Sequence, residues 1–258
     1  MYVGIDAGAS ATKAVIINER EEIISYAIVP SGVNFKASAE EALKKALEKG
    51  NLTERAVLHV VSTGYGRELV NANATFSEII CIARGVSKLI PEARTIIDVG
   101  GQDSKAIRID LSGRVLDFVM NDKCAAGTGR FLEVMANILR RSIEELGSLH
   151  LKSSNPIKIS STCTVFAESE VISYISRGRP IEDVIAGLHY AIAERVLTMA
   201  SRIGLEREVV LTGGVAKNLG FVEAISSKMG FKPLIPKEPQ IVCAFGAALL
   251  ARRSHTAR

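Results

Sequence analysis

Two cysteines stand where a thiol could do chemistry. Cys124, in NDKCAAGTGRFLE, lies just before Thr128, a candidate helix N-cap, and Cys163, in SSTCTVFAESEV, lies in a Ser/Thr-rich cap. Apolar residues recur at helical spacing after both, so each thiol is expected at or just before a helix start. The free N–H groups and positive dipole end there stabilise anions and favour metal ligation. The alternative is two small residues packed at helix caps.

An iron–sulfur cluster bound by this pair would require more than one chain. An iron–sulfur cluster is usually held by four thiolates, and the pair offers two. A two-fold homodimer would supply four, with Cys124 and Cys163 of each chain at one shared site on the axis. Cys81 and Cys243 are expected to pack between helices, and there is no CxxC pair or histidine spacing that would indicate zinc.

An internal repeat organises the elements that must position these groups. VGIDAGASATKAVII (3–17) and TIIDVGGQDSKAIRI (95–109) superpose at an offset of 92 residues, which sets Asp6 on Asp98 and Lys13 on Lys105. Each copy has the pattern of a strand, an Asp-x-Gly turn and a second strand, and a third strand is expected after each. The repeat predicts two similar lobes.

Helices are expected between and after the two copies. The first is predicted to have Ser38 at its N-cap and to end at Gly50, and a longer one to have Pro180 near its first position and Gly204 past its end. Residues 208–230 have the pattern of a buried strand, a Gly-Gly turn and a helix, and CAFGAALLARR that of a closing helix. The predicted fold class is α/β.

The glycine turns point to a nucleotide. Without a Cβ in the way, backbone N–H groups of such a turn can converge on phosphate oxygens. Asp6 and Asp98, at strand ends, could hold Mg²⁺ through water. A single turn of this kind is more often a capped β-turn. Two matched copies followed by LTGGVAKN (211–218) favour nucleotide binding.

In their order, these three segments resemble the phosphate and adenosine motifs of the actin, Hsp70 and sugar-kinase superfamily of ATPases. The resemblance implies two ribonuclease H-like lobes with a nucleotide cleft between them. The first lobe would hold residues 1–94 plus 244–258, and the second, residues 95–243, would carry the two motif cysteines.

The turns and the family resemblances that their motifs carry imply the residues of the ATP site. Expected around the nucleotide are Asp6, Gly8, Ala9, Ser10, Ala11, Thr12, Lys13, Gly100, Gly101, Gln102, Gly213, Gly214, Asn218, Pro236 and Gln240. The candidates for ordering Mg²⁺ or the attacking water are Asp98, Gln102 and Asp103.

The cysteine segments, set between DVGGQDSK and LTGGVAKN, resemble the activator component of 2-hydroxyacyl-CoA dehydratases, in the BadF/BadG/HgdC-type ATPase family. This resemblance implies a homodimer with one [4Fe–4S] cluster held by Cys124 and Cys163 of both chains. ATP hydrolysis to ADP, with Mg²⁺, would drive one electron from a ferredoxin or flavodoxin donor into a separate dehydratase. Residues Ser62 to Arg67 also resemble the family, but no physical role follows from the sequence.

Composition narrows the possible partners. The net charge is +4, the charges are interspersed, and no basic stretch is interleaved with aromatic residues, so nucleic acid is not expected as a partner. There is no apolar run of roughly 18 residues and no signal-peptide pattern, so neither a membrane anchor nor secretion is expected. The expected location is the cytoplasm.

Three other functions stay open at this point. A small-molecule kinase would keep the ATPase fold without the cluster and would tolerate Cys124→Ser. An actin-like or Hsp70-like module would use ATP to gate a protein partner. Within the family, the electron could instead go to a benzoyl-CoA reductase or a double-cubane-cluster reductase.

Overall fold

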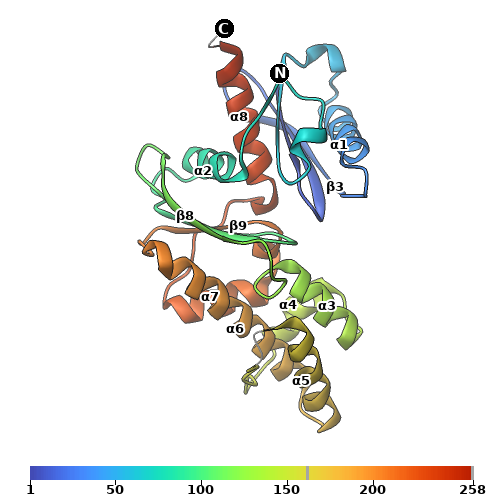
Figure 1. Cartoon of the computed structure of the whole chain (residues 1–258), viewed down its shortest axis with the longest axis vertical. Helices are drawn as coiled ribbons and strands as arrows, with labels where there is room; N and C mark the ends of the chain where they lie inside the picture. Colours follow the sequence, from blue (N-terminus) through green and yellow to red (C-terminus); the bar gives the residue numbers. More distant parts are fainter. Residues whose placement is uncertain (161–162, 257–258) are drawn as a thin grey trace. The chain divides into compact units, whose positions relative to one another are not determined.

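The computed structural model describes residues 1–160 and 163–256 (Figure 1). The chain forms two compact units, each described separately below: residues 1–93, 109–116 and 236–258 make unit 1, and 94–108 with 117–235 make unit 2. The boundaries expected from the sequence assigned 109–116 and 236–243 to the second lobe, whereas in the structure these residues group with unit 1.

Unit 1 contains a five-stranded mixed sheet in the order β3-β2-β1-β4-β5. Its strands are β1 (Tyr2–Ala7), β2 (Ala11–Ile17), β3 (Ile23–Pro30), β4 (His59–Thr63) and β5 (Ala74–Thr75). The first three strands are antiparallel neighbours, while β4 runs parallel to β1 and β5 parallel to β4. This order and these directions are those of a ribonuclease H-like sheet.

The helices of unit 1 are α1 (Phe35–Lys49), α2 (Glu78–Leu89) and α8 (Val242–Thr256), with short 3₁₀ turns at Glu54–Ala56, Arg67–Leu69 and Pro239–Ile241. Small residues let α8 approach its neighbours closely. A Cβ on Gly4 of β1 would lie 2.0 Å from the carbonyl oxygen of Ala244, and one on Gly246 would lie 1.8 Å from that of Cys81 in α2. The closing helix is therefore an integral part of unit 1.

Unit 2 repeats the arrangement with four strands in the order β8-β7-β6-β9. These are β6 (Thr95–Val99), β7 (Ser104–Ile109), β8 (Val115–Asn121) and β9 (Val209–Thr212), of which the last residue of β7 and the first two of β8 group with unit 1. Strand β6 is antiparallel to β7 and parallel to β9, as β1 is to β2 and β4. The register pairs Asp6 with Lys13 and Asp98 with Lys105, which confirms the predicted repeat and α/β class.

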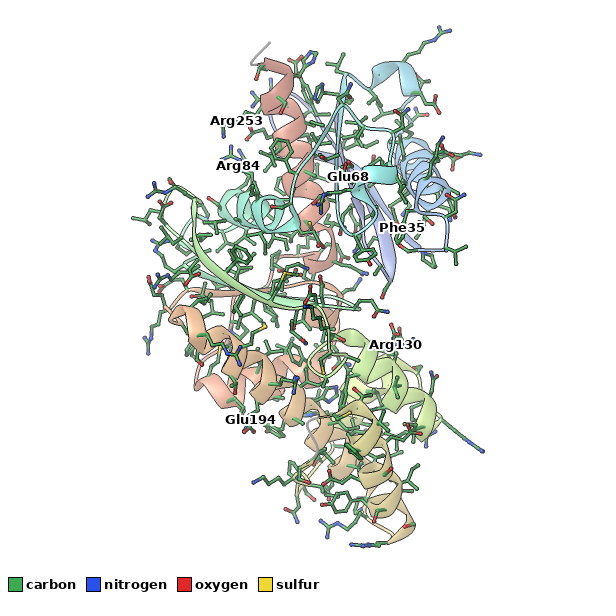
Figure 2. The ribbon with its side chains drawn as sticks, viewed as in Figure 1. Phe35, Glu68, Arg84, Arg130, Glu194 and Arg253 are labelled. Atoms are coloured by element: carbon green, nitrogen blue, oxygen red, sulfur yellow. The ribbon has the colours of Figure 1, made fainter. Side chains whose placement is uncertain are left out.

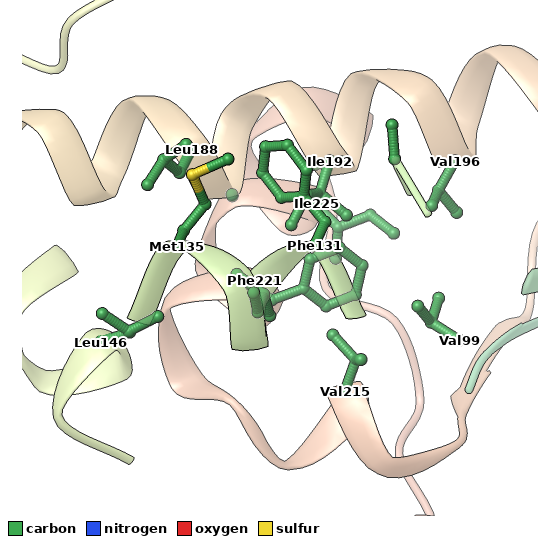
Figure 3. Close-up of a cluster of buried hydrophobic side chains, with 14 of the residues drawn as sticks. Val99, Phe131, Met135, Leu146, Leu188, Ile192, Val196, Val215, Phe221 and Ile225 are labelled. Atoms are coloured by element: carbon green, nitrogen blue, oxygen red, sulfur yellow. The ribbon is translucent and has the colours of Figure 1, made fainter. Parts of the chain in front are cut away.

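The helices of unit 2 are α3 (Gly129–Leu139), α4 (Ile143–His150), α5 (Thr164–Ser176), α6 (Ile181–Ala200) and α7 (Leu219–Met229), with 3₁₀ turns at Ser201–Ile203 and Gly214–Lys217. Their apolar faces enclose one core (Figure 3). Phe131 and Met135 of α3 meet Leu188 and Ile192 of α6 and Phe221 of α7 in it. This core fixes the start of α3, the element that follows Cys124.

One predicted helix boundary is wrong. The N-cap of α1 is Asn34, whose side chain accepts a hydrogen bond from Ala37 N, and not Ser38. Ser38 lies inside the first turn and donates to the carbonyl of Asn34 at 3.2 Å. Both residue types can cap a helix, and apolar packing of Phe35 extends the helix to the earlier one. The predicted end at Gly50 is confirmed.

Among the described residues, no helix is both long and apolar enough to cross a membrane.

Candidate nucleotide and thiol sites

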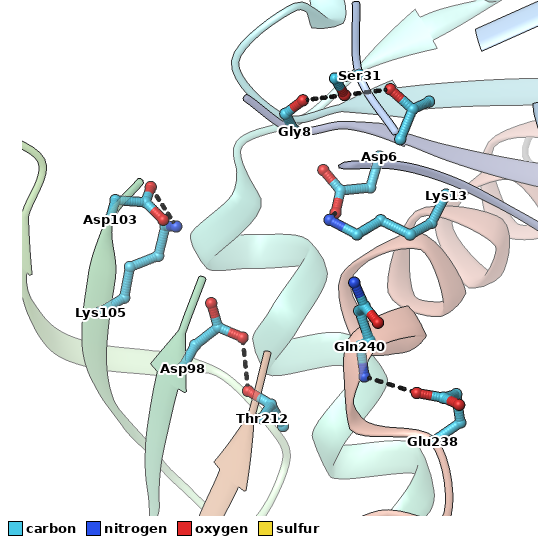
Figure 4. A network of polar contacts seen from close by, with 11 residues as sticks. Asp6, Gly8, Lys13, Ser31, Asp98, Asp103, Lys105, Thr212, Glu238 and Gln240 are labelled. Carbon is cyan, nitrogen blue, oxygen red and sulfur yellow. Dashed lines mark hydrogen bonds and ion pairs between the residues drawn. The ribbon is translucent and has the colours of Figure 1, made fainter. Parts of the chain in front are cut away.

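The first glycine turn, between β1 and β2, is held by Ser31. Ser31 Oγ donates to the carbonyl of Gly8 at 2.6 Å and lies 2.8 Å from Thr12 Oγ1, and Ser31 N donates to the carbonyl of Ser10 (Figure 4). A Cβ on Gly8 would lie 2.8 Å from the carbonyl oxygen of Ala11, so the turn requires glycine there. Sequence patterns did not single out Ser31, because its role depends on pairing between β2 and β3.

Asp6 is buried beside this turn. Its Oδ2 pairs with Lys13 Nζ at 3.0 Å, while Oδ1 has no hydrogen-bond partner among the described residues. Ligand atoms of Asp6, Glu78 and Cys243 lie within 4.8 Å of one another. Carboxylate oxygens suit Mg²⁺, whereas a thiol does not. The sequence predicted Asp6 but missed Glu78, which comes from the first turn of α2.

The second glycine turn, between β6 and β7, is flanked by an ion pair and a buried carboxylate. Lys105 is 1% exposed and contacts Asp103 at 2.6 Å, and Asp98 accepts a hydrogen bond from Thr212 Oγ1 at 2.7 Å (Figure 4). Gly100 N donates to the carbonyl of Asp103, which closes the turn. Gln102 is exposed at its tip. Asp98 and Asp103 are thus both engaged within unit 2.

The residues expected near adenosine divide between the units. In unit 2, Gly213 follows β9 with φ 88°, and a Cβ there would lie 2.3 Å from the carbonyl oxygen of Val99. Asn218 is the N-cap of α7: its Oδ1 accepts from Phe221 N at 3.0 Å. The Asn218 side chain therefore has a clear structural role.

Pro236 and Gln240 lie in unit 1. Pro236 is buried, and the backbone N–H of Gln240 donates to Glu238 at 3.4 Å.

Ser62 to Arg67 has a structural explanation in the repeat. Gly64 follows β4 as Gly213 follows β9, and both have positive φ, 94° and 88°. A Cβ on Gly64 would lie 2.6 Å from the carbonyl carbon of Ala7, just as Gly213 abuts Val99. The segment is therefore the unit 1 counterpart of the Gly213 turn.

The second turn is hydrogen-bonded directly to the helix that follows Cys124. Gly129 N donates to the carbonyl of Gly100 at 2.8 Å, and Arg130 N donates to that of Gly101 at 2.7 Å. A Cβ on Gly129 would lie 3.2 Å from Gly100 O, from Gly101 Cα and from Val215 Cγ2. Figure 2 marks Arg130 in the first turn of α3. A shift of the glycine turn would thus reach α3 through two backbone hydrogen bonds.

The two motif cysteines have different surroundings. Cys163 is the N-cap residue of α5, as predicted. Cys124 lies in the loop before α3, whose N-cap is Thr128, and the first N–H groups of α3 are taken by the glycine turn. Thr128 Oγ1 donates to the carbonyl of Ala125 and does not cap the helix. The expected stabilisation by free helix N–H groups is therefore wrong for Cys124.

Accessibility separates the four cysteines. Cys163 is exposed and Cys124 partly exposed, whereas Cys81 and Cys243 are buried. Burial raises the pKa of the Cys81 thiol to about 12, so it stays protonated near neutral pH. Only the two motif thiols are open to solvent for ligation.

The amino-acid sequence matches known proteins over nearly its whole length. The model of the BadF/BadG/BcrA/BcrD ATPase family matches residues 3–251. The 2-hydroxyisocaproyl-CoA dehydratase activator of Clostridioides difficile is 48% identical over 97% of this chain and 95% of its own. The (R)-2-hydroxyglutaryl-CoA dehydratase activating ATPase of Acidaminococcus fermentans is 43% identical, over 96% of each chain.

The fold matches a solved structure equally well. The Clostridium difficile activator of 2-hydroxyisocaproyl-CoA dehydratase, with bound ADPNP, superposes with a TM-score of 0.95 at 47% identity. The match covers 100% of this chain and 96% of that one. The family resemblance drawn from the motifs is confirmed.

Proposed function

The chain belongs to the BadF/BadG/BcrA/BcrD ATPase family, and on that premise we propose that it is an ATP-dependent one-electron donor that activates a 2-hydroxyacyl-CoA dehydratase. Two copies of the chain hold one [4Fe–4S] cluster through Cys124 and Cys163 of each. A ferredoxin or flavodoxin supplies the electron, and the dehydratase receives it.

One observation carries the proposal: the two thiols open to solvent are the two in the family-like motifs. A cluster needs accessible thiolates, and a chain that offers two must be paired with a second copy to reach four. The donor set fits this group, since both sulfurs are accessible and precede helices α3 and α5. When bound, the cluster supplies reversible one-electron storage.

The nucleotide is proposed to bind the two glycine turns. Residues Gly8 to Lys13 and Gly100 to Gln102 would surround the phosphate oxygens, and Gly100 N is not one of the donors because it already donates to the carbonyl of Asp103. Asp6 and Glu78 offer carboxylate oxygens for hydrated Mg²⁺, which the unpartnered Oδ1 of Asp6 favours. Asp98, Gln102 and Asp103 are the proposed positioning residues for the attacking water.

The same contacts offer a route from nucleotide to thiol. The carbonyls of Gly100 and Gly101 accept from the first N–H groups of α3, and the Cys124 loop leads into that helix. A change in the turn when ATP replaces ADP would therefore move the start of α3 and the loop before it. We propose that this movement alters access to the cluster and docking of the dehydratase.

The test is anaerobic preparation with iron and sulfide counted per chain. The wild type and Cys81→Ala should hold about four irons per two chains. Cys124→Ala and Cys163→Ala should each lose them, and Cys81→Ala is a matched control because that thiol is buried. Iron retained in both single motif variants would refute the shared site.

A second measurement tests the activity itself. Reduced wild-type protein with ATP should activate a purified 2-hydroxyacyl-CoA dehydratase, whereas the same protein with ADP should not. A colourless protein that phosphorylates a small acceptor, and tolerates Cys124→Ser, would instead identify a kinase.

A further inference from the structure

Arg195, on α6, contacts the sulfur of Cys124. Its Nη2 donates a hydrogen bond to Cys124 Sγ at 3.4 Å, across 71 residues of sequence. The contact could not be predicted from the sequence, because nothing in the residue pattern of α6 distinguishes Arg195 from any other arginine on a helix.

Other contacts of the Cys124 loop hold the cysteine next to Arg195. Asn121 Nδ2 donates to the carbonyls of Cys124 and Ala126, at 2.9 and 3.1 Å, and so shapes the loop. Gly127, with φ 92°, lies directly against the arginine: a Cβ there would be 3.2 Å from Arg195 Cδ. The aliphatic part of Arg195 therefore supports the loop that carries the sulfur.

Its helix holds Arg195 in place. Ile192 and Val196, on either side of it in α6, are both 1% exposed in the core of unit 2. Arg195 also lines an open pocket of about 960 Å³. Because its side chain borders this pocket, a shorter side chain would enlarge the pocket and would not leave a void in the core. Substitutions at this position can thus test the contact in a folded protein.

We propose that Arg195 is a positioning residue for the cluster: it donates an N–H···S hydrogen bond to the Cys124 ligand and stabilises the more negative, reduced state. The presence of a cluster in this inference rests on the proposed function. The choice of Arg195 rests on its hydrogen bond to Cys124. Hydrogen bonds and positive charge at ligand sulfurs raise a cluster's reduction potential. Cys163 lies at a helix N-terminus instead, so the two ligands of each chain are stabilised by different groups.

The proposal predicts a shift in the midpoint potential, measured by EPR-monitored redox titration of the anaerobic holoprotein. Arg195→Gln should lower the potential by ~59 mV or more, which is a tenfold change in a one-electron equilibrium. Arg195→Lys, which keeps a cationic donor, should restore part of it. Arg202→Gln is the matched control, because Arg202 lines the same pocket and is exposed. A potential for Arg195→Gln equal to that of wild type would overturn the proposal.

A second readout does not need the cluster. In cluster-free protein with ¹⁵N-labelled arginine side chains, the Arg195 guanidinium resonance, assigned by its loss in Arg195→Lys, should move in Cys124→Ala. It should stay in place in Cys81→Ala. No movement in Cys124→Ala would show that the contact is absent in solution and would reject the inference.

The two measurements distinguish the two failures. If wild-type protein binds no iron, the proposed function fails and the cluster role of Arg195 fails with it, whatever the resonance does. If iron binds but Arg195→Gln leaves the potential unchanged, the proposed function stands and only the inference is lost.

Discussion

At the residue scale, one lysine in each copy of the repeat forms an ion pair beside the glycine turn. Lys13 and Lys105 occupy the same register position in the repeat, opposite Asp6 and Asp98. Lys13 pairs with Asp6, and Lys105 pairs with Asp103, two residues before it, where the first copy has Ala11. Asp98 accepts a hydrogen bond from Thr212.

The buried Lys105 pair should matter for stability. Asp103→Ala removes the carboxylate from an ammonium group that is 1% exposed, and we expect a loss of about 2 kcal/mol in the free energy of unfolding. The measurement is urea denaturation. Glu41→Ala is the control, since the Lys45–Glu41 pair has the same 2.6 Å distance but is half exposed, and it should cost less than about 0.5 kcal/mol. Equal losses would show that burial does not strengthen the Lys105 pair.

A buried histidine should make stability depend on pH. Burial, with His150 nearby, lowers the pKa of His189 from 6.5 to about 3. Between those values the unfolded chain binds a proton that the folded chain does not. This contribution is therefore complete above pH 6.5 and declines as pH falls, by up to ~1.4 kcal/mol per pH unit.

Denaturation of wild type and His189→Leu at several pH values between 7 and 5 checks this. In His189→Leu, the change in the free energy of unfolding per pH unit should be smaller by up to ~1.4 kcal/mol, the amount that one bound proton contributes. His255→Gln, a change at an exposed position, should keep the wild-type pH dependence. A slope unchanged in His189→Leu would mean that another group titrates.

At the scale of elements, the contact between the second glycine turn and α3 depends on the absence of a Cβ at Gly129. A Cβ on Gly129 would lie 3.2 Å from three atoms of the turn and its neighbour, so Gly129→Ala should force them apart. We expect a loss of about 1 to 3 kcal/mol in stability. We also expect a smaller difference between ATP and ADP in hydrogen exchange over residues 121–131.

Gly32→Ala is the matched control for this substitution. The nearest atom to a Cβ at Gly32 is Ser38 Oγ at 3.8 Å, an ordinary contact. If Gly129→Ala preserved the full nucleotide-dependent difference in exchange, the contact between the turn and α3 would not transmit the signal.

The elements themselves were mostly predictable, and their contacts were not. The strands of both copies follow from alternating apolar residues around the Asp-x-Gly turns, and Pro180 and Gly50 mark helix ends as predicted. The helix start at Asn34 was missed because two capping residues stood four positions apart. Local patterns cannot rank two such candidates when packing decides.

At the scale of the whole molecule, the repeat relates the two sheets. It explains the segment Ser62 to Arg67, for which the sequence motifs alone gave no physical role. Gly64 and Gly213 occupy equivalent turns, although only the second was predicted as a site residue. Ser31 and Arg195 could not be predicted from the sequence. Each donates a hydrogen bond to a residue that is distant in the sequence and is brought close only by the fold, Gly8 and Cys124 respectively. The residue pattern and the family resemblance both drew attention to Cys124 and Cys163, and neither predicted the arginine that contacts Cys124.

If both glycine turns bind the nucleotide, each unit should contribute to its affinity. ADPNP at 100 times its dissociation constant should stabilise the protein by about 2.7 kcal/mol, a rise in Tm of about 5 to 10 °C for a chain of this size. Lys13→Met in unit 1 and Gln102→Ala in unit 2 should each reduce that rise, while Lys45→Met, on the exposed surface of α1, should not.

Differential scanning calorimetry with and without ADPNP measures the effect against each variant's own Tm. Because Gln102 is exposed at the tip of its turn, its truncation should leave the ligand-free Tm almost unchanged, so a smaller rise reports binding and not folding. A rise reduced only by the unit 1 variant would confine nucleotide binding to the first turn and would remove the proposed role of Gly100 to Gln102.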